Sequence, residues 1–291
     1  MKKIKLDTNK IIHGAGQSLE SFRKYWDAVE EEKPVLYMFY LRIDEISKKL
    51  PEKVKEMNSV DKRLIPQIAL NLKVKEKGQQ LKEIVNEEYN AELAYLAKYF
   101  KNIKKPVFLR IGYEFNNPQN NYSPSEFIVS WKYILDFFRK KGVKNVFFVW
   151  DCCSAFNQEV NQIMEFYPGD DYVDWFGNNF FGIKSFIGNK NKVTEDFYKE
   201  AIAHKKPLMI CECSPARIGV EKGEKSWNLW FKPFFQWIDS HPDTKSFCYI
   251  NWDWAIDWKS PEWGNGRIEE NEFVRKKYIQ ELKKPKYLNL K

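Results

Sequence analysis

The chain has 291 residues, of which 43% are hydrophobic, 30% charged and 16% aromatic, and its formal net charge is +8. This composition excludes a disordered chain and is rich enough in apolar residues for a large core. The chain as given contains no apolar run of about 18 residues and no apolar segment after its basic N-terminus, so we expect neither a membrane span nor a signal peptide. A cytoplasmic protein and a secreted one whose signal has been removed both fit this sequence.

Short apolar runs alternate with amphipathic stretches along the whole chain. Eight such runs occur, at residues 11–16, 34–41, 64–72, 106–115, 145–150, 173–181, 207–213 and 247–254. Intervening segments such as 18–32, 89–102, 123–142 and 226–240 have the helical period, with Ser or Asn near their starts. Alternation of this kind favours a parallel sheet covered by helices, and eight repeats predict a (β/α)8 TIM barrel.

We expect one catalytic domain over residues 1–291, because no linker rich in Pro, Gly or Ser divides the chain. No G-x-G-x-x-G motif follows the first run, which argues against a dinucleotide-binding domain.

The cysteines and histidines do not form a recognisable metal or disulfide pattern. The five cysteines lack paired C-x-x-C spacing, and the three histidines lie far apart in the sequence. We therefore expect small buried cysteines, no metal site and no cofactor.

The positive net charge does not by itself predict a nucleic-acid partner. Lysines are mixed with glutamates in helix-like segments, and no basic cluster, RNP-like motif or zinc finger occurs. We expect no nucleic-acid or membrane partner, although a basic protein would suit an acidic glycan.

Two glutamates close apolar runs at the edge where barrel enzymes carry their active sites. Glu114 ends the run at 106–115, and Glu212 ends the run at 207–213. Strand alternation predicts that Arg110, Gly112 and Glu114 face the barrel interior, with Gly112 leaving room for a neighbour or ligand. The simpler interpretation is that each glutamate pairs with a basic residue at the rim. Paired carboxylates also fit glycoside hydrolysis, in which one donates a proton and the other attacks the sugar or activates water.

Aromatic and amide side chains near the strand ends fit the same interpretation. We expect Trp150, Trp252 and Trp254 to offer flat surfaces to sugar rings. We expect four amides to bind hydroxyls: Asn116, Asn117, Asn178 and Asn179. Most other tryptophans, including Trp131, Trp230 and Trp237, have helical spacing and are expected in the core.

Three segments resemble glycoside hydrolase family 26. LRIGYEFN (109–116) resembles that family's strand-four motif, YPGDDYVDWFGNNFF (167–181) its approach to strand six, and KPLMICECSPA (206–216) its strand seven. The resemblance implies a retaining barrel enzyme, acting mostly on β-1,4-mannan and in some members on β-glucan or β-1,3-xylan. It implies Glu114 as acid/base, Glu212 as nucleophile, Arg110 as the arginine supporting the nucleophile, and Trp252 as the strand-eight platform.

The sequence departs from the family pattern in two places. Tyr113 stands where the family has His before the acid/base, and Phe180 and Phe181 fill the stretch where it has Tyr. We expect Tyr113 to compensate by supplying a phenol from another strand.

We therefore predict a retaining hydrolase of β-linked oligo- or polysaccharide, monomeric and without cofactor. The alternative is a carbohydrate-binding barrel that has lost turnover. Segments 41–63 and 259–273 are expected to be the loops that decide whether the cleft is closed at one end.

Overall fold

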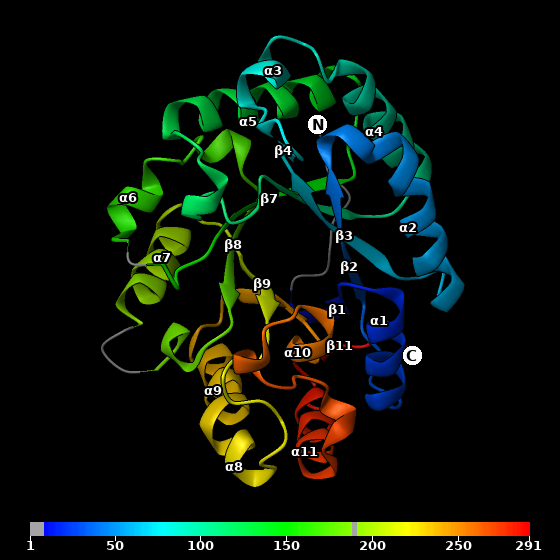
Figure 1. The fold of residues 1–291 in the computed structure, drawn as a ribbon, viewed down its shortest axis with the longest axis vertical. Helices are drawn as coiled ribbons and strands as arrows, with labels where there is room; N and C mark the ends of the chain where they lie inside the picture. Colours follow the sequence, from blue (N-terminus) through cyan, green and yellow to red (C-terminus); the bar gives the residue numbers. More distant parts are fainter. Residues whose placement is uncertain (1–8, 157, 188–190) are drawn as a thin grey trace.

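Eight parallel strands close into a barrel in the computed structural model, which describes residues 9–156, 158–187 and 191–291 (Figure 1). Each strand pairs with its neighbour along the chain, and the last pairs with the first through Ile12–Ala15 and Ser246–Tyr249. The predicted TIM barrel is confirmed. Its strands are β1 (Ile11–Gly16), β2 (Leu36–Arg42), β3 (Ile65–Asn71), β6 (Val107–Ile111), β7 (Val146–Cys152), β8 (Trp175–Phe180), β9 (Leu208–Cys213) and β10 (Thr244–Tyr249).

Helices surround the barrel on its outer side (Figure 1). They are α1 (Leu19–Ala28), α2 (Ile46–Val60), α3 (Leu81–Val85), α4 (Asn90–Ile103), α5 (Pro124–Lys140), α6 (Val160–Met164), α7 (Lys192–Ala203), α8 (Glu224–Ser226), α9 (Lys232–Ser240), α10 (Trp254–Asp257) and α11 (Glu272–Leu282). A short hairpin, β4 (Lys73–Val74) with β5 (Gly78–Gln79), follows β3, and β11 (Tyr287–Leu288) pairs with β1.

Segment 41–63 is not the loop that we expected. It completes β2 and then forms α2, whose Ile46, Leu50 and Val54 are buried against the barrel. Its charged residues occupy the solvent side of an amphipathic helix, which explains why a polar loop was expected there.

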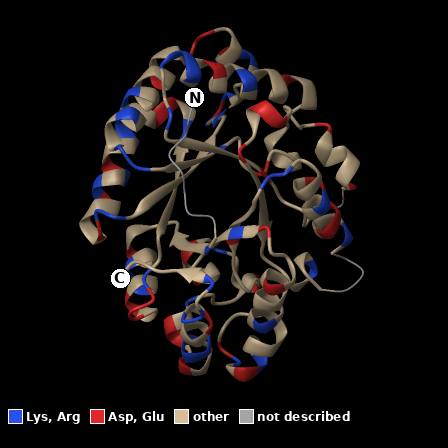
Figure 2. Ribbon diagram, turned by 180° about the vertical axis from the view of Figure 1, so that it is seen from behind, with Lys and Arg blue, Asp and Glu red and all other residues tan. Residues whose placement is uncertain are grey.

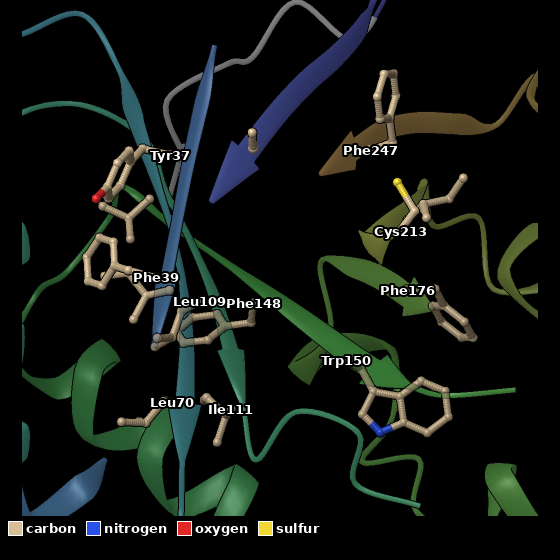
Figure 3. Close-up of a cluster of buried hydrophobic side chains, with 14 of the residues drawn as sticks. Tyr37, Phe39, Leu70, Leu109, Ile111, Phe148, Trp150, Phe176, Cys213 and Phe247 are labelled. Carbon is tan, nitrogen blue, oxygen red and sulfur yellow. The ribbon is translucent and has the colours of Figure 1, made fainter. Parts of the chain in front are cut away.

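The core has two layers because each strand alternates its side chains between the two faces of the sheet. Ile12, Leu36, Phe108, Val149 and Met209 fill the barrel interior. A larger cluster lies between the strands and the helices, and Figure 3 shows part of it. Because the interior is packed at this level, a site can form only at an open end of the barrel.

Two strands end earlier than the apolar runs that predicted them. β6 stops at Ile111 and β10 stops at Tyr249, so Glu114 and Trp252 lie in the turns that follow. Both turns leave the carboxyl ends of the strands, which is the edge where barrel active sites lie.

Charged residues of both signs are interspersed over the helices (Figure 2). Several pair along one helix, such as Lys49 with Glu52 and Lys53 with Glu56 on α2. In the described ranges, no helix combines the length and apolar character needed to span a membrane.

Candidate active site

Glu212 faces the barrel interior because β9 contains one extra residue relative to β8. Asn178 pairs with Ile210 and Asn179 with Glu212, so the register shifts at Cys211. A bulge of this kind re-aims the side chain that follows it and is common beside active sites. Cys211 packs in the interior and Cys213 in the outer layer, which leaves Glu212 on the interior side at the end of the strand.

Arg110 of β6 binds Glu212 and also links it to Asp151 of β7. Its Nη2 donates to Glu212 Oε1 at 2.7 Å, and its Nε donates to Asp151 Oδ2 at 2.9 Å. The exposed fraction of the side chain is 8% for Glu212 and 0% for the other two. Burial raises the pKa of Asp151, and the charge of Arg110 opposes that rise. The guanidinium supplies the positive charge that a buried Glu212 carboxylate needs.

Glu114 lies in a strained turn just after β6. Gly112 has a φ of 56° and Glu114 a φ of 49°. At Gly112 a Cβ would come within 3.0 Å of Phe127 Cε2, so glycine is required there by the backbone and by its neighbours. The expectation that Gly112 and Glu114 continue the strand alternation that begins at Arg110 is therefore wrong. The left-handed backbone of Glu114 costs about 1–3 kcal/mol, a kind of strain that concentrates in functional sites.

The surroundings of Glu114 favour its protonated form. Burial, together with the charge of Glu212, raises the pKa of Glu114 to about 7, although hydrogen bonds from Asn179 and Asn117 oppose the rise. Asn179 Nδ2 donates to Glu114 Oε1 at 2.8 Å, and Asn117 Nδ2 donates to Oε2 at 3.2 Å. A carboxyl group with a pKa near neutrality can both give and accept a proton.

Asn179 connects the two carboxyl groups. It pairs with Glu212 across the β8–β9 ladder while its side chain bonds Glu114. Its Oδ1 is buried and has no hydrogen-bond partner among the described residues. The structure thus brings Glu114 and Glu212 to the same end of the barrel, as the sequence predicted.

Two phenols border Glu212. Tyr40, at the end of β2, lies beside Glu212, and burial and that carboxylate both raise the pKa of Tyr40. Gln17 Nε2 donates to Tyr40 Oη at 2.8 Å, so the Tyr40 proton is left free to point to Glu212. Tyr113 packs edge-on against Tyr40 at 5.3 Å, with the Arg110 guanidinium 5.3 Å from its ring centre.

Of the predicted tryptophans, Trp252 lies at the edge of the site, and Trp254 packs against Trp252 on its buried side. Trp252 is partly exposed, whereas Trp254 is buried. The Trp254 Nε1 donates to Ser214 Oγ at 3.0 Å, two residues after Glu212. The two indoles meet edge to face at 5.4 Å. Trp252 is therefore placed to contact a ligand, and Trp254 is placed to hold Trp252.

Three predicted site residues do not face the site. Trp150 is fully buried in the outer layer (Figure 3). Phe115 stacks on it with ring centres 4.5 Å apart, and the Trp150 Nε1 donates to the Phe166 carbonyl. Asn178 also points outward and bonds Ser154. Asn116 is buried and bonds the Cys153 backbone through both ends of its amide. The prediction that these three bind substrate is wrong, because packing and internal hydrogen bonds occupy them.

Asp151, which the sequence analysis missed, follows the wrongly chosen Trp150 by one position, and strict alternation from the interior residue Val149 would have identified it. Asn179 was among the amides expected to bind hydroxyls, and alternation from the interior residue Trp175 distinguishes it from Asn178. Gly177 lies between Trp175 and Asn179 on β8. Glycine is required at this position because a Cβ would come within 2.7 Å of Cys211 Sγ. Tyr40 carried no usable signal, since only barrel closure brings β2 near β9.

The five cysteines are all buried and free, as predicted. Among the described residues, no group of three or more His, Cys, Asp or Glu side chains could hold a metal ion.

Two known proteins share sequence with almost the whole chain. The chain is 26% identical to a β-1,3-xylanase of an Alcaligenes species and 28% identical to β-1,3-xylanase TXYA of a Vibrio species, with 96% of the chain covered in each case. It spans only 65% and 66% of the lengths of those relatives.

Solved structures share the fold. A family 26 β-mannanase from Bacteroides ovatus superposes with a TM-score of 0.71 at 16% identity, covering 97% of this chain and 90% of that one. An endo-β-1,4-mannanase from Bacillus sp. JAMB-750 gives 0.71 at 15% identity, covering 97% and 88%. The sequence pattern of glycosyl hydrolase family 26 matches residues 68–239, which run from within β3 to within α9 and contain Arg110, Glu114, Asp151 and Glu212. The chain therefore belongs to glycosyl hydrolase family 26.

Proposed function

We propose that this chain hydrolyses a β-linked polysaccharide with retention of anomeric configuration, using Glu114 as acid/base and Glu212 as nucleophile. The observation that carries this proposal is the unlike environment of two neighbouring carboxyl groups. Glu212 is bound to the guanidinium of Arg110 at 2.7 Å, whereas Glu114 has no cationic partner among the described residues and a pKa raised to about 7. Carboxyl groups that differ in this way can divide the roles of nucleophile and acid.

In the first step the Glu212 carboxylate attacks the anomeric carbon while protonated Glu114 donates its proton to the leaving oxygen. The bond from that carbon to the leaving oxygen breaks, and a glycosyl ester of Glu212 forms. Arg110, which is itself paired with Asp151, orients the attacking carboxylate. Tyr40 contacts the same carboxylate from β2.

In the second step Glu114 acts as a base. Ester formation removes the negative charge of Glu212, which is one cause of the raised pKa of Glu114. The pKa of Glu114 therefore falls in the intermediate, and Glu114, ionised by the first step, takes a proton from water. That water attacks the ester and releases Glu212 and the sugar.

We propose β-1,3-xylan as the first substrate to test. Support comes from the two β-1,3-xylanases, which share 26% and 28% identity over 96% of the chain. The likeness to mannanases is at 16% identity or below in the structures above, so it supports the barrel and not the sugar.

Reducing-sugar release should be measured on β-1,3-xylan, β-1,4-mannan, β-glucans and acidic glycans, with wild type and Glu212→Ala in parallel. We expect release by wild type on a β-linked polymer and a loss of at least about a thousandfold in the variant.

The competing function is a binding barrel without turnover, which Tyr113 in place of His and Phe180 in place of Tyr favour. Binding of a polymer with equal affinity by both proteins, and hydrolysis by neither, would replace our proposal with that one. The matched control is Glu270→Ala, since Glu270 is exposed on the outside of the segment before α11.

A further inference from the structure

Trp258 is exposed to solvent in a protein that buries its other tryptophans wholly or in part. Its exposed fraction is 64%, whereas the other ten tryptophans are buried or partly buried. Ile256, in the same turn, is 69% exposed. An indole left in water forgoes the free energy of burial, so two large apolar side chains exposed together mark a contact surface.

The turn that carries Trp258 is held by several interactions. Asp253 caps α10 by accepting from the Ala255 amide at 3.0 Å, and the Trp258 amide donates to the Trp254 carbonyl at 3.3 Å. Arg267 binds Asp257 at 3.1 Å. The indole is therefore presented from a fixed backbone, which lowers the entropic cost of binding to it.

A row of three tryptophan rings leads from this turn to Ser214, two residues after Glu212. Trp254 bonds Ser214, two residues after Glu212, and contacts Trp252 at 5.4 Å. Trp252 and Trp258 then lie nearly parallel, with ring centres 5.9 Å apart and planes 23° apart. The row runs from the buried end of the site to the solvent-exposed surface, and its exposed member is Trp258.

We propose that Trp258 is a binding platform for a sugar unit of a β-linked glycan chain, beyond the units that lie at the two carboxylates. The inference rests on the proposed function, because it takes the glycan that the carboxylates would cleave. A pyranose ring presents a flat C–H face to an indole and keeps its hydroxyls in water, which suits a platform that is itself exposed. Trp258 would thus select long chains over short ones.

Binding should be measured by calorimetry on the Glu212→Ala background, so that turnover does not consume the ligand. The probes are β-1,3-xylooligosaccharides from disaccharide to hexasaccharide and soluble β-1,3-xylan, with manno-oligosaccharides as a second series. For the Trp258→Ala double variant we expect an affinity loss that grows with chain length and reaches about tenfold on the longest ligands. Trp258→Phe should recover most of that loss.

Trp26→Ala is the matched control, because its indole is partly exposed on α1 and lies with its ring centre 5.2 Å from Lys33 Nζ, away from Trp252 and Trp254. Equal affinity of the Glu212→Ala parent and its Trp258→Ala derivative at every length would overturn the inference and leave the proposed function standing. A parent that binds no glycan, together with a wild type that cleaves none, would overturn both.

Discussion

Glu114 and Glu212 are chemically identical, and their neighbours alone separate their roles. Glu212 shares the Arg110 guanidinium with Asp151, whereas Glu114 receives only amide hydrogen bonds, from Asn179 and Asn117. Amide donors stabilise a carboxylate less than a cation does, so the burial of Glu114 is left largely uncompensated.

This difference predicts how stability depends on pH. The pKa of Glu114 is raised from 4.5 to about 7 on folding, so its ionisation destabilises the folded protein progressively as pH rises from about 4.5 to about 7. Glu114→Gln, which resembles the protonated form, should therefore be more stable than wild type above about pH 7, by up to about 3 kcal/mol. The gain should vanish below pH 4.5.

Urea unfolding of both proteins at about pH 4 and about pH 8 checks this expectation. A constant difference in unfolding free energy between the two pH values would contradict the raised pKa.

Tyr40 should matter to turnover more than to binding. Its side chain lies beside Glu212, and its hydroxyl accepts from Gln17 at 2.8 Å, while Gln17 has an unusual φ of 95°. Tyr40→Phe removes a hydroxyl beside the charged carboxylate of Glu212, so we expect kcat to fall about tenfold or more with little change in KM. Tyr37→Phe, on the same strand but facing the helices, is the control. Equal kinetics of the two variants would show that Tyr40 does not position Glu212.

At the scale of strands and helices, the sequence predicts where an element lies better than which way its last residues point. All eight strands fall within or overlap the apolar runs, because unbroken apolar residues are what a doubly covered parallel strand requires. Trp150 and Asn178 were each misassigned by one position. Successive side chains of a strand point to opposite faces of the sheet, and the bulge at Cys211 changes this alternation beside Glu212.

The buried Trp150 and the partly exposed Trp252 can be told apart by mutation. Trp150 is fully buried among Phe115, Phe176 and Phe197, so Trp150→Ala should cost about 3–5 kcal/mol of unfolding free energy. Trp252→Ala should instead raise KM and leave the unfolding free energy nearly unchanged. Chemical denaturation and substrate saturation curves, measured on both variants, separate the effects. A raised KM with unchanged stability for Trp150→Ala would return Trp150 to the site.

At the scale of the whole molecule, the barrel explains why residues distant in sequence converge. Glu114 and Glu212 were identifiable from the sequence because each ends an apolar run, and the carboxyl ends of all barrel strands lie at one edge. Asp151 binds Arg110 from the neighbouring strand β7, Asn179 of β8 binds Glu114, and Tyr40 reaches Glu212 from β2 only because the barrel closes. Alternation along a strand can indicate which side chains face the interior but not which of them meet, so a single sequence predicts the pair of carboxylates and not their full surroundings.

The central claim is that Glu212 attacks the sugar while Glu114 handles the proton. The most direct test is proton NMR of the anomer first released from a β-linked oligosaccharide, recorded before mutarotation. Double displacement predicts the β-anomer as the first product. Initial release of the α-anomer would mean that water attacks the sugar directly, and would contradict the role proposed for Glu212.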